Sequence, residues 1–457
     1  MGKTVAASEQ LHIVMIPWFA YGHILPYFEL SNKLAEKGHK ITLVVPNKVK
    51  LDLEPKIRHP SLISLHAFTV PHIEPLPPGT ETCSDVPIEL QHHLAVAMDR
   101  ARPEVESIIS AIDDPKPDLL FYDNAYWVPE IATKLGMKSV FYQIACALSI
   151  TRIKQTPSAS ASASASAKLF TLPKWVLTPK VLGDARANYG EGITYYQRVK
   201  KALSSCDAIA LRTCREIEGE SSDILAAQYN KPVFLTGPVL PEVEFLPPLD
   251  NSWAEWLAKF GPKSVVLCCF GSQYVPDKAQ LQEMALALED TGLPFLMSVK
   301  PPTECATIEE ALPEGFSERV KERGVVHGGW VQQLQILAHP SVGCFICHCG
   351  YGSMWEGLLS DNQLVLLPQL PDQLMMAQML AEKLKVGVMV DREEDDGWVS
   401  RKNLCQAVKS VMDPHSEFAA LLKNNHANFR DKLLTNGFMA NYLEVFDQDL
   451  KRFLTAN

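Results

Sequence analysis

Short apolar runs alternate with segments of helical periodicity along this chain. Residues 11–17 and 41–45 are apolar runs of the kind that form buried strands, and residues 24–37 between them carry apolar side chains near helical spacing. Gly38 follows the helical segment where a C-terminal cap belongs. Strands joined through helices form parallel sheets that are covered on both faces. The sequence therefore predicts an α/β fold.

The same alternation occurs in both halves of the 457 residues, which is too long for one ordinary core. In the first half, further strands are predicted at 119–122 and 139–142. In the second half, the predicted strands are 264–270, 295–299, 343–347, 364–367 and 387–390. Two Rossmann-like domains are expected, with ligands in the cleft beyond the carboxyl ends of their strands.

The domain boundaries follow from composition and periodicity. We predict an N-terminal domain at 1–240, a Pro-rich linker at 241–252, a C-terminal domain at 253–436 and a helix at 437–457 that returns to the first domain. Residues 158–167 are a strict Ser-Ala alternation, which has neither core side chains nor a recognition surface. We interpret that segment as an engineered linker.

Charge and cysteine usage limit the partners. A net charge of −10 argues against nucleic acid or an anionic membrane surface, because both require a basic footprint. No run of about 18 apolar residues is present, so no membrane span is expected. The 11 cysteines are scattered or lie in apolar runs, which is typical of reduced thiols. We expect a cytoplasmic monomer.

His23 and Asp123 are the candidate catalytic pair. His23 follows the first predicted strand, and Asp123 ends the strand at 119–122, so both should lie at one edge of one sheet. A carboxylate beside an imidazole fixes its tautomer and raises its basicity, as a general base requires. His23 alone could equally be a capping or packing residue, and only the pair favours catalysis.

Residues 330–373 contain the strongest motif of the chain. A strand ends before Gly350, and glycines at the start of the next helix let the backbone approach a diphosphate. This stretch resembles the signature box of plant family 1 UDP-glycosyltransferases. The matching positions are Trp330, Gln333, His339, Pro340, His348, Gly350, Ser353, Glu356, Pro368, Asp372 and Gln373.

The resemblance implies the GT-B architecture of two facing Rossmann-like domains and a donor site for a UDP-sugar, with no metal and no further cofactor. Trp330 would stack on uracil, Glu356 would accept hydrogen bonds from the ribose hydroxyls, and His348 would donate to phosphate. Asp372 and Gln373 would hold the transferred sugar. The predicted donor-site residues are Ser272, Trp330, Val331, Gln333, His348, Gly350, Gly352, Ser353, Glu356, Asp372 and Gln373.

The chain departs from the family at Tyr351 and Gly352, where most members have Trp-Asn. In this it is similar to the branch-forming subgroup, which adds a sugar to an existing sugar on a plant glycoside. The resemblance implies a flavonoid or phenylpropanoid glycoside as the acceptor, and UDP-rhamnose, UDP-glucose or a UDP-pentose as the donor. Transfer to an aglycone is one alternative, and non-catalytic binding of a nucleotide-sugar or glycoside is another.

Other motifs carry less weight. Residues 344–348 (CFICH) fit a haem-attachment or dithiol pattern, but they also form part of an apolar strand. The acidic run 393–396 is interpreted as a solvated loop and not as a metal site. A nicotinamide-dependent oxidoreductase would need Gly-x-Gly-x-x-Gly after the first strand, and residues 18–23 read WFAYGH instead.

Overall fold

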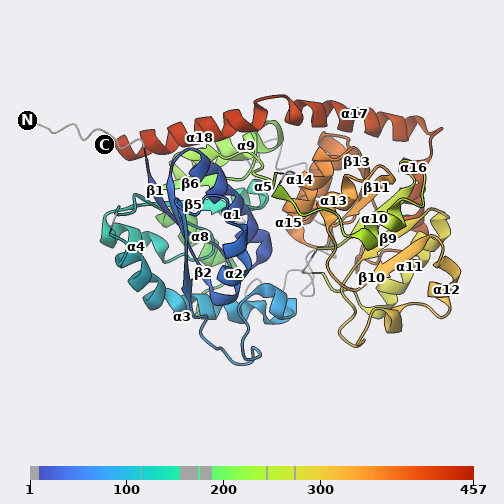
Figure 1. The fold of residues 1–457 in the computed structure, drawn as a ribbon, viewed down its shortest axis with the longest axis horizontal. Helices are drawn as coiled ribbons and strands as arrows, with labels where there is room; N and C mark the ends of the chain where they lie inside the picture. The colour runs from blue at the N-terminus through green and yellow to red at the C-terminus, as the bar shows by residue number, and fades with distance from the viewer. Residues whose placement is uncertain are drawn as a thin grey trace, which may run out of the picture. The chain divides into compact units, whose positions relative to one another are not determined.

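The computed structural model describes residues 10–113, 115–154, 173–174, 188–242, 245–271 and 274–456. The Ser-Ala segment 158–167 and Ser272 lie outside these residues. The described chain separates into two compact units (Figure 1). The first contains residues 10–154, 188–242 and 437–456, and the second contains 173–174 and 245–436.

A sheet of seven parallel strands forms the centre of the first unit, in the order β3-β2-β1-β4-β5-β6-β7. The chain runs outward from β1 to β3, returns beside β1 as β4, and then continues outward on the other side. The order therefore reverses between β1 and β4, and open α/β sheets bind ligands beyond the carboxyl ends of the strands at such a point. The strands are β1 (His12–Ile16), β2 (Lys40–Pro46), β3 (Ile63–Phe68), β4 (Leu119–Tyr122), β5 (Lys138–Gln143), β6 (Ala208–Leu211) and β7 (Val233–Leu235).

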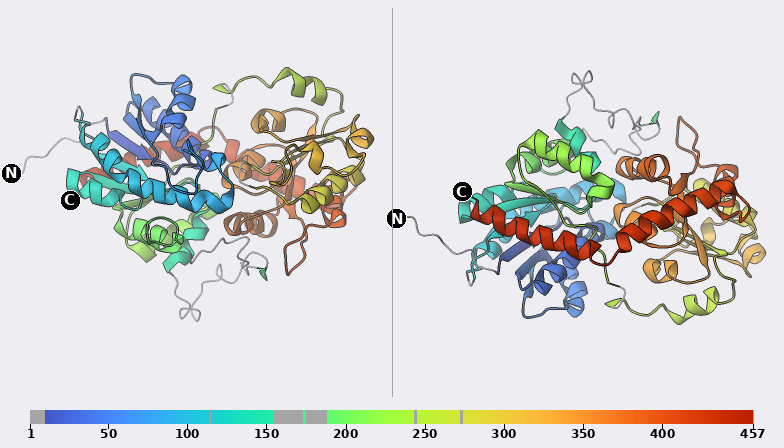
Figure 2. Two further views of the ribbon diagram at one scale, coloured as in Figure 1. Left: turned by 90° about the horizontal axis from the view of Figure 1, so that it is seen from below. Right: turned by 90° about the horizontal axis from the view of Figure 1, so that it is seen from above.

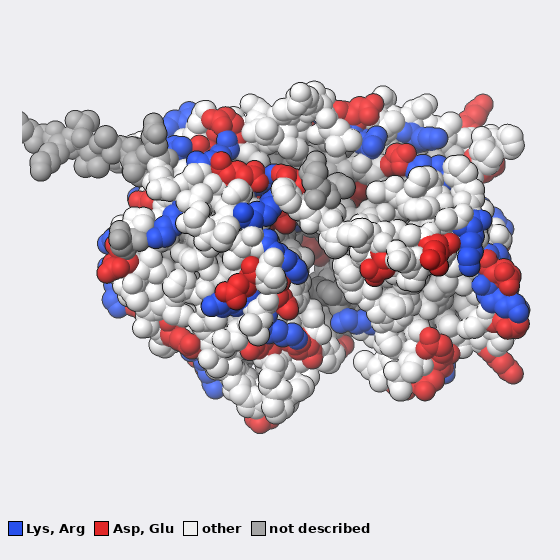
Figure 3. Space-filling model, in the orientation of Figure 1, with Lys and Arg blue, Asp and Glu red and all other residues white. Residues whose placement is uncertain are grey.

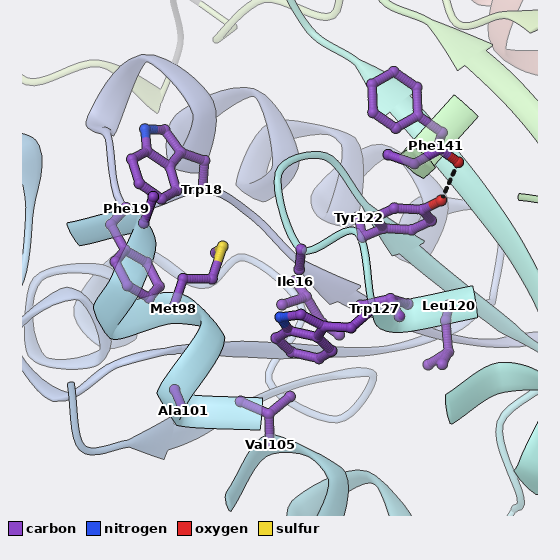
Figure 4. Packing of buried hydrophobic residues seen from close by; sticks show 14 of the residues in the cluster. Ile16, Trp18, Phe19, Met98, Ala101, Val105, Leu120, Tyr122, Trp127 and Phe141 are labelled. Carbon is purple, nitrogen blue, oxygen red and sulfur yellow. Dashed lines mark hydrogen bonds between the residues drawn. The ribbon is translucent and has the colours of Figure 1, made fainter. Parts of the chain in front are cut away.

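Two apolar clusters cover the faces of this sheet, because successive residues of a strand point to opposite faces. Ile16 and Trp127 belong to one cluster with residues of α3 (Figure 4). Met15 belongs to the other, with residues of α1 and α18. The helices of the unit are α1 (Tyr21–Glu36), α2 (Asn47–Leu53), α3 (Gln91–Ser110), α4 (Val128–Leu135), α5 (Ala147–Thr151), α8 (Tyr195–Ser205), α9 (Arg215–Tyr229) and α18 (Phe438–Thr455).

The C-terminal helix α18 packs on the first unit through both apolar and polar contacts. Phe446 lies edge-on to Phe121 of β4, with ring centroids 6.3 Å apart. The main-chain N–H of Leu11 donates to Nδ1 of His39 over 3.0 Å, so Nε2 carries the proton and donates to Asp447 over 2.6 Å. The second view of Figure 2 shows α18 along this unit. The helix is therefore part of the first unit's core.

The second unit repeats the arrangement with six parallel strands in the order β10-β9-β8-β11-β12-β13. The order reverses between β8 and β11, so this sheet has a switch point of its own. The strands are β8 (Val265–Cys269), β9 (Phe295–Ser298), β10 (Gly324–His327), β11 (Val342–Cys347), β12 (Gln363–Leu366) and β13 (Gly387–Met389). The helices are α10 (Asn251–Leu257), α11 (Lys278–Thr291), α12 (Phe316–Val320), α13 (Gln333–Leu337), α14 (Tyr351–Leu359), α15 (Pro371–Gln378), α16 (Arg401–Met412) and α17 (Glu417–Leu434).

The predicted strands agree with the observed ones to within one or two residues, but helix boundaries differ more. Helix α1 begins at Tyr21, because Ala20 already accepts the N–H of Ile24 at 2.9 Å. Apolar residues at 373–383 recur near helical spacing, which predicts one helix, but the observed helix begins at Pro371 and ends in a π-helical turn over Met379–Lys383. A π turn has no distinct pattern of apolar residues that would reveal it in the sequence.

Within the described residues, no helix is long and apolar enough to span a bilayer. Acidic and basic side chains are interspersed on the face that Figure 3 shows. The 11 cysteines all lie in the described residues and form no disulfide with one another, and ten of them are buried. Cys344 and Cys347 lie inside β11, at 0% and 2% exposure, so neither is accessible for haem attachment or redox exchange.

Four histidines are buried in the described structure, His12, His39, His348 and His426, and burial lowers the pKa of each below 6.5. The unfolded chain therefore binds protons more tightly at these sites, so they stabilise the fold above about pH 6.5 and less as the pH falls. We expect the midpoint of thermal unfolding to be several degrees lower at pH 5.5 than at pH 7.5, as followed by circular dichroism. His426→Gln, which keeps a donor for the carbonyl of Leu358, should weaken this dependence.

The control for this experiment is His72→Gln, which removes an exposed imidazole. Equal midpoints at the two pH values, or a higher midpoint at pH 5.5, would contradict the expectation.

Candidate active site

His23 and Asp123 lie at the switch point of the first sheet. Ile16, the last residue of β1, pairs with Tyr122, the last residue of β4, so the two strands end side by side. Asp123 follows β4 directly, and His23 lies in the first turn of α1 after β1. Nδ1 of His23 lies 2.6 Å from Oδ2 of Asp123. The topology thus brings together two residues 100 positions apart in the chain.

This hydrogen bond assigns the tautomer of His23. A carboxylate oxygen accepts, so Nδ1 carries the proton and Nε2 has the free lone pair. The other oxygen of Asp123, Oδ1, accepts the main-chain N–H of Asn124 over 2.5 Å. The His23 side chain is 27% exposed, whereas that of Asp123 is 6% exposed. A buried carboxylate therefore orients a partly exposed imidazole.

A second group of residues lies at the switch point of the second sheet, between β8 and β11. His348 follows β11, and its ring lies between two glycines. A Cβ on Gly350 would overlap Nε2 of His348, and a Cβ on Gly271 would lie 2.9 Å from the ring. Gly271 also has φ +67°, which favours glycine. Both glycines are needed for this packing of the imidazole.

The protonation state of His348 follows from its surroundings. Burial lowers its pKa to about 4, so the ring is neutral near pH 7. Its Nδ1 lies 3.3 Å from the carbonyl oxygen of Cys269 and must be the donor there. Nε2 is then an acceptor, and His348 can donate to a phosphate oxygen only if it takes up a proton. A bound anion would favour that uptake, because a nearby negative charge raises the pKa of an imidazole.

Helix α14 begins where β11 has ended and offers an anion site. The N–H of Met354 donates to Gly350 at 2.8 Å, so the N–H groups of residues 351–353 precede the first intrahelical bonds. The first turn holds no acidic residue and, among the described residues, no side-chain cap. The N–H groups of a helix N-terminus point along the helix axis, and together with the helix dipole they favour a negatively charged ligand. A Cβ added at Gly352 would meet nothing within 4 Å, so the space beside this residue is open.

A hydrogen-bonded set adjoins this helix end. The side-chain amide of Gln333 donates to the Ser353 hydroxyl over 3.0 Å and also to Glu356. Glu356 lies about one turn inside α14. Trp330, three residues before Gln333, is 81% exposed, while Val331 is buried. An exposed indole, a carboxylate and a helix N-terminus are the groups that suit a ligand with a flat ring, hydroxyls and phosphates.

Asp372 and Gln373 lie in the first turn of α15. The carbonyl oxygen of the Gln373 side chain accepts the main-chain N–H groups of Gln369 at 2.9 Å and Leu370 at 3.2 Å. Gln373 therefore caps its own helix, and only its NH₂ group remains to meet a ligand. Asp372 is partly exposed in the same turn.

No group of three or more His, Cys, Asp or Glu in the described parts of the chain could hold a metal ion. The acidic run 393–396 is exposed in a loop, where Asp395 pairs with Lys174 at 3.2 Å. Arg198, a fully buried cation that donates to Asn124 in the loop after Asp123, was not predicted from the sequence. Its position carried the signal, because in α8 it falls on the same helix face as the buried Ala202, four residues later.

Comparison with known proteins shows which family this chain is similar to. The profile of the family described as UDP-glucoronosyl and UDP-glucosyl transferase matches residues 228–427. UDP-glucosyl transferase 79L3 of Saponaria officinalis is 52% identical over 97% of this chain and 98% of its own length. Anthocyanidin 3-O-glucoside 2'''-O-xylosyltransferase of Arabidopsis thaliana is 49% identical over 97% of both chains.

Solved structures share the fold at lower identity. UGT73P12 of Glycyrrhiza uralensis, complexed with glycyrrhetinic acid 3-O-monoglucuronide, has a TM-score of 0.79 at 21% identity, over 97% of this chain and 96% of its own. UGT89C1 of Arabidopsis thaliana, complexed with UDP-L-rhamnose, has a TM-score of 0.77 at 21% identity, over 96% and 99%. At this identity the likeness establishes the fold alone, and it confirms the predicted α/β class.

Proposed function

This chain belongs to the UDP-glycosyltransferase family, and we propose that it transfers a sugar from a UDP-sugar to a hydroxyl of a small plant glycoside, with inversion at the anomeric carbon. It is an enzyme of the GT-B class and uses a UDP-sugar donor. The observation that carries the proposed mechanism is the 2.6 Å hydrogen bond from Nδ1 of His23 to Asp123 at the first switch point.

In the proposed reaction, Nε2 of His23 removes the proton of an acceptor hydroxyl. The oxygen attacks the anomeric carbon of the donor, and the bond from that carbon to the β-phosphate oxygen breaks in the same displacement. Asp123 stabilises the imidazolium that forms, because its carboxylate lies against Nδ1. UDP leaves with its electron pair, and His23 then returns the proton to solvent or to the phosphate.

The donor is assigned to the second switch point. The N-terminal end of α14 and the Ser353 hydroxyl favour the diphosphate, and Ser272 is proposed to add a further donor. Trp330 presents an indole face for uracil, and Glu356 presents carboxylate oxygens for the ribose hydroxyls. Asp372 and the NH₂ group of Gln373 would meet the sugar.

The acceptor proposal rests on the relatives. One of them is named as a xylosyltransferase of an anthocyanidin 3-O-glucoside. An enzyme with that name adds a sugar to a molecule that already carries one. We therefore favour a flavonoid or phenylpropanoid glycoside as the acceptor, and transfer to an aglycone is the alternative. UDP-rhamnose, UDP-glucose and a UDP-pentose all suit an NH₂ group at Gln373, since it can donate to whichever hydroxyl the sugar presents.

A donor-by-acceptor panel tests this proposal. UDP-rhamnose, UDP-glucose and UDP-xylose would each be offered with an anthocyanidin 3-O-glucoside and with its aglycone, and the products weighed by mass spectrometry. A mass gain on the glucoside alone supports sugar-on-sugar transfer. A gain on the aglycone alone supports the alternative, and UDP release without a glycosylated product in every pair contradicts both.

Transfer is expected to continue without a divalent cation. Helix α14 and neutral donors, rather than a metal, would meet the charge of the leaving UDP, and the described residues hold no cluster of metal ligands. We expect initial rates in excess EDTA within about twofold of those with Mg²⁺, a difference under 0.5 kcal/mol in the barrier. Abolition by EDTA with restoration by Mg²⁺ would refute metal independence.

We also propose a cytoplasmic location, because cysteines without disulfides are typical of a reducing compartment. A monomer is likewise proposed, and light scattering at micromolar concentration would test it.

A further inference from the structure

A buried ion pair contacts the loop that carries Asp123. Arg198 of α8 has no exposed side-chain surface, and its Nη2 lies 2.5 Å from Oδ2 of Asp99 of α3, which is 6% exposed. Replacing a buried ion pair with apolar residues is often neutral or stabilising, so such a pair is weak evidence of a role in stability alone. The other contacts of Arg198 indicate what else it does.

The guanidinium also donates hydrogen bonds to main-chain carbonyl oxygens in three separate segments of the chain. Its Nη1 donates to Asn124 over 2.8 Å, its Nε donates to Tyr189 over 2.9 Å, and its Nη2 approaches Ala95 at 3.4 Å. The ring of Tyr126 lies over the guanidinium at 4.9 Å. Two of these contacts, Asn124 and Tyr126, lie in the loop that begins with Asp123.

Asn124 connects Arg198 to the proposed base. The main-chain N–H of Asn124 donates to Oδ1 of Asp123 over 2.5 Å, and its carbonyl accepts from Arg198. Oδ2 of Asp123 in turn accepts from His23. One residue thus separates the guanidinium from the carboxylate that orients the imidazole.

Helix α8 holds the other neighbour of Asp123 as well. The hydroxyl of Tyr122 donates to the carbonyl of Ala202 over 2.8 Å (Figure 4). Ala202 is one helical turn after Arg198. Both residues that flank Asp123 are therefore bound to one helix, one through a side-chain hydroxyl and one through a buried cation.

The segment that contains Gly190 and Glu191 also packs against the ion pair. A Cβ on Gly190 would overlap the Arg198 guanidinium, and Gly190 has φ +119°. The main-chain N–H of Glu191 donates to Oδ2 of Asp99 at 3.1 Å. Oδ1 of Asp99 is buried, and among the described residues it has no hydrogen-bond partner. Arg198 therefore compensates the negative charge of the Asp99 carboxylate, and Asp99 in turn fixes the direction of the guanidinium.

We propose that Arg198, oriented by Asp99, is a positioning residue that holds the Asn124 carbonyl and so keeps the Asp123 carboxylate against His23. This inference rests on the proposed function of the His23–Asp123 pair. The Arg198 side chain has no exposed surface, so the proposal assigns it no contact with either substrate. Its contribution should be to turnover, because a small displacement of a catalytic group lowers the rate while leaving binding elsewhere unchanged.

Arg198→Lys is the main test. It keeps a cation for Asp99, but an ammonium cannot donate to Asn124, Tyr189 and Asp99 in the geometry of a guanidinium. With the most active donor–acceptor pair of the panel, we expect kcat to fall by about 10- to 100-fold while the KM for the UDP-sugar changes by less than about threefold. Because a single loss of charge could prevent folding, Asp99→Asn combined with Arg198→Gln serves as a neutral second variant and should show the same split.

A double-mutant cycle separates positioning from a general loss of structure. In the Asp123→Asn background the proposal predicts that Arg198→Lys lowers kcat by less than about threefold, because the group it positions has already been changed. An equal loss in both backgrounds, or a loss confined to KM, would overturn the proposal. Full activity of Asp123→Asn would instead contradict the proposed function of the pair.

Arg100→Gln is the matched control. Arg100 neighbours Asp99 on α3 and pairs with Glu191 at 2.7 Å, but both side chains of that pair are more than half exposed. Its loss should leave kcat and KM unchanged. A loss of kcat in Arg100→Gln equal to that in Arg198→Lys would show that the loop is merely sensitive to charge, and would also overturn the proposal.

Discussion

His23→Ala is expected to lower kcat by about 10²- to 10⁴-fold, the usual contribution of a general base, while UDP binds with unchanged affinity. Among the described residues, the imidazole of His23 is the titratable group that hydrogen-bonds to Asp123, and its side chain is 27% exposed. The variant removes a partly exposed side chain from the first unit. It leaves the residues assigned to UDP in the second unit unchanged.

The measurement is kcat by mass spectrometry of product, together with UDP titration by calorimetry. His72→Ala is the control, since His72 is exposed and lies in a loop. A kcat of His23→Ala within a few-fold of that of the parent would contradict the proposed mechanism. Loss of UDP affinity together with kcat would mean that the substitution had damaged the fold or that His23 contacts the donor.

Glu356→Ala should raise the Kd for UDP by about 100-fold or more, because hydrogen bonds to a charged group are worth about 1.5–3 kcal/mol each and two ribose hydroxyls are assigned to it. The carboxylate sits about one turn inside α14 and is oriented by the Gln333 amide. Glu356→Gln keeps the shape and one acceptor, so a smaller loss of about 10-fold is expected.

Comparing UDP with 2′-deoxy-UDP tests the assignment of Glu356 to ribose. The parent should bind 2′-deoxy-UDP more weakly than UDP, and Glu356→Ala should bind the two alike. Glu382→Ala, which removes an exposed carboxylate from the same unit, is the control. If Glu356→Ala still discriminates between the two ligands as the parent does, Glu356 does not hold the 2′-hydroxyl.

Much of the fold follows from local patterns. The run at 119–122 coincides with β4, and the run at 343–347 differs from β11 by one residue. Strands buried on both faces must be apolar throughout, so their position is written in a few consecutive residues. The ends of helices are less clear, as Tyr21 and the π turn at Met379–Lys383 show, because main-chain bonds there depend little on side-chain type.

Part of the proposed site also follows from the chain order. In a parallel sheet the carboxyl ends of neighbouring strands lie at one edge, so residues just after β1 and β4 had to be close. His23 and Asp123 satisfy that condition, and the structure adds the 2.6 Å distance. The role of these residues in catalysis stays a prediction until the variants above are measured.

The sequence could locate nine of the described strands, the residues that follow them, and the family that the box at 330–373 resembles, because each of these is a property of neighbouring residues. Strands β3, β6, β7 and β10 were not predicted. Only the packed chain shows that Arg198 reaches Asn124, 74 residues away, and Asp99, 99 residues away, or that Gln373 turns its carbonyl to its own helix. The partner of a buried charge and the direction of a hydrogen bond depend on which segments pack together. Packing is set by the whole chain, and no local pattern records it.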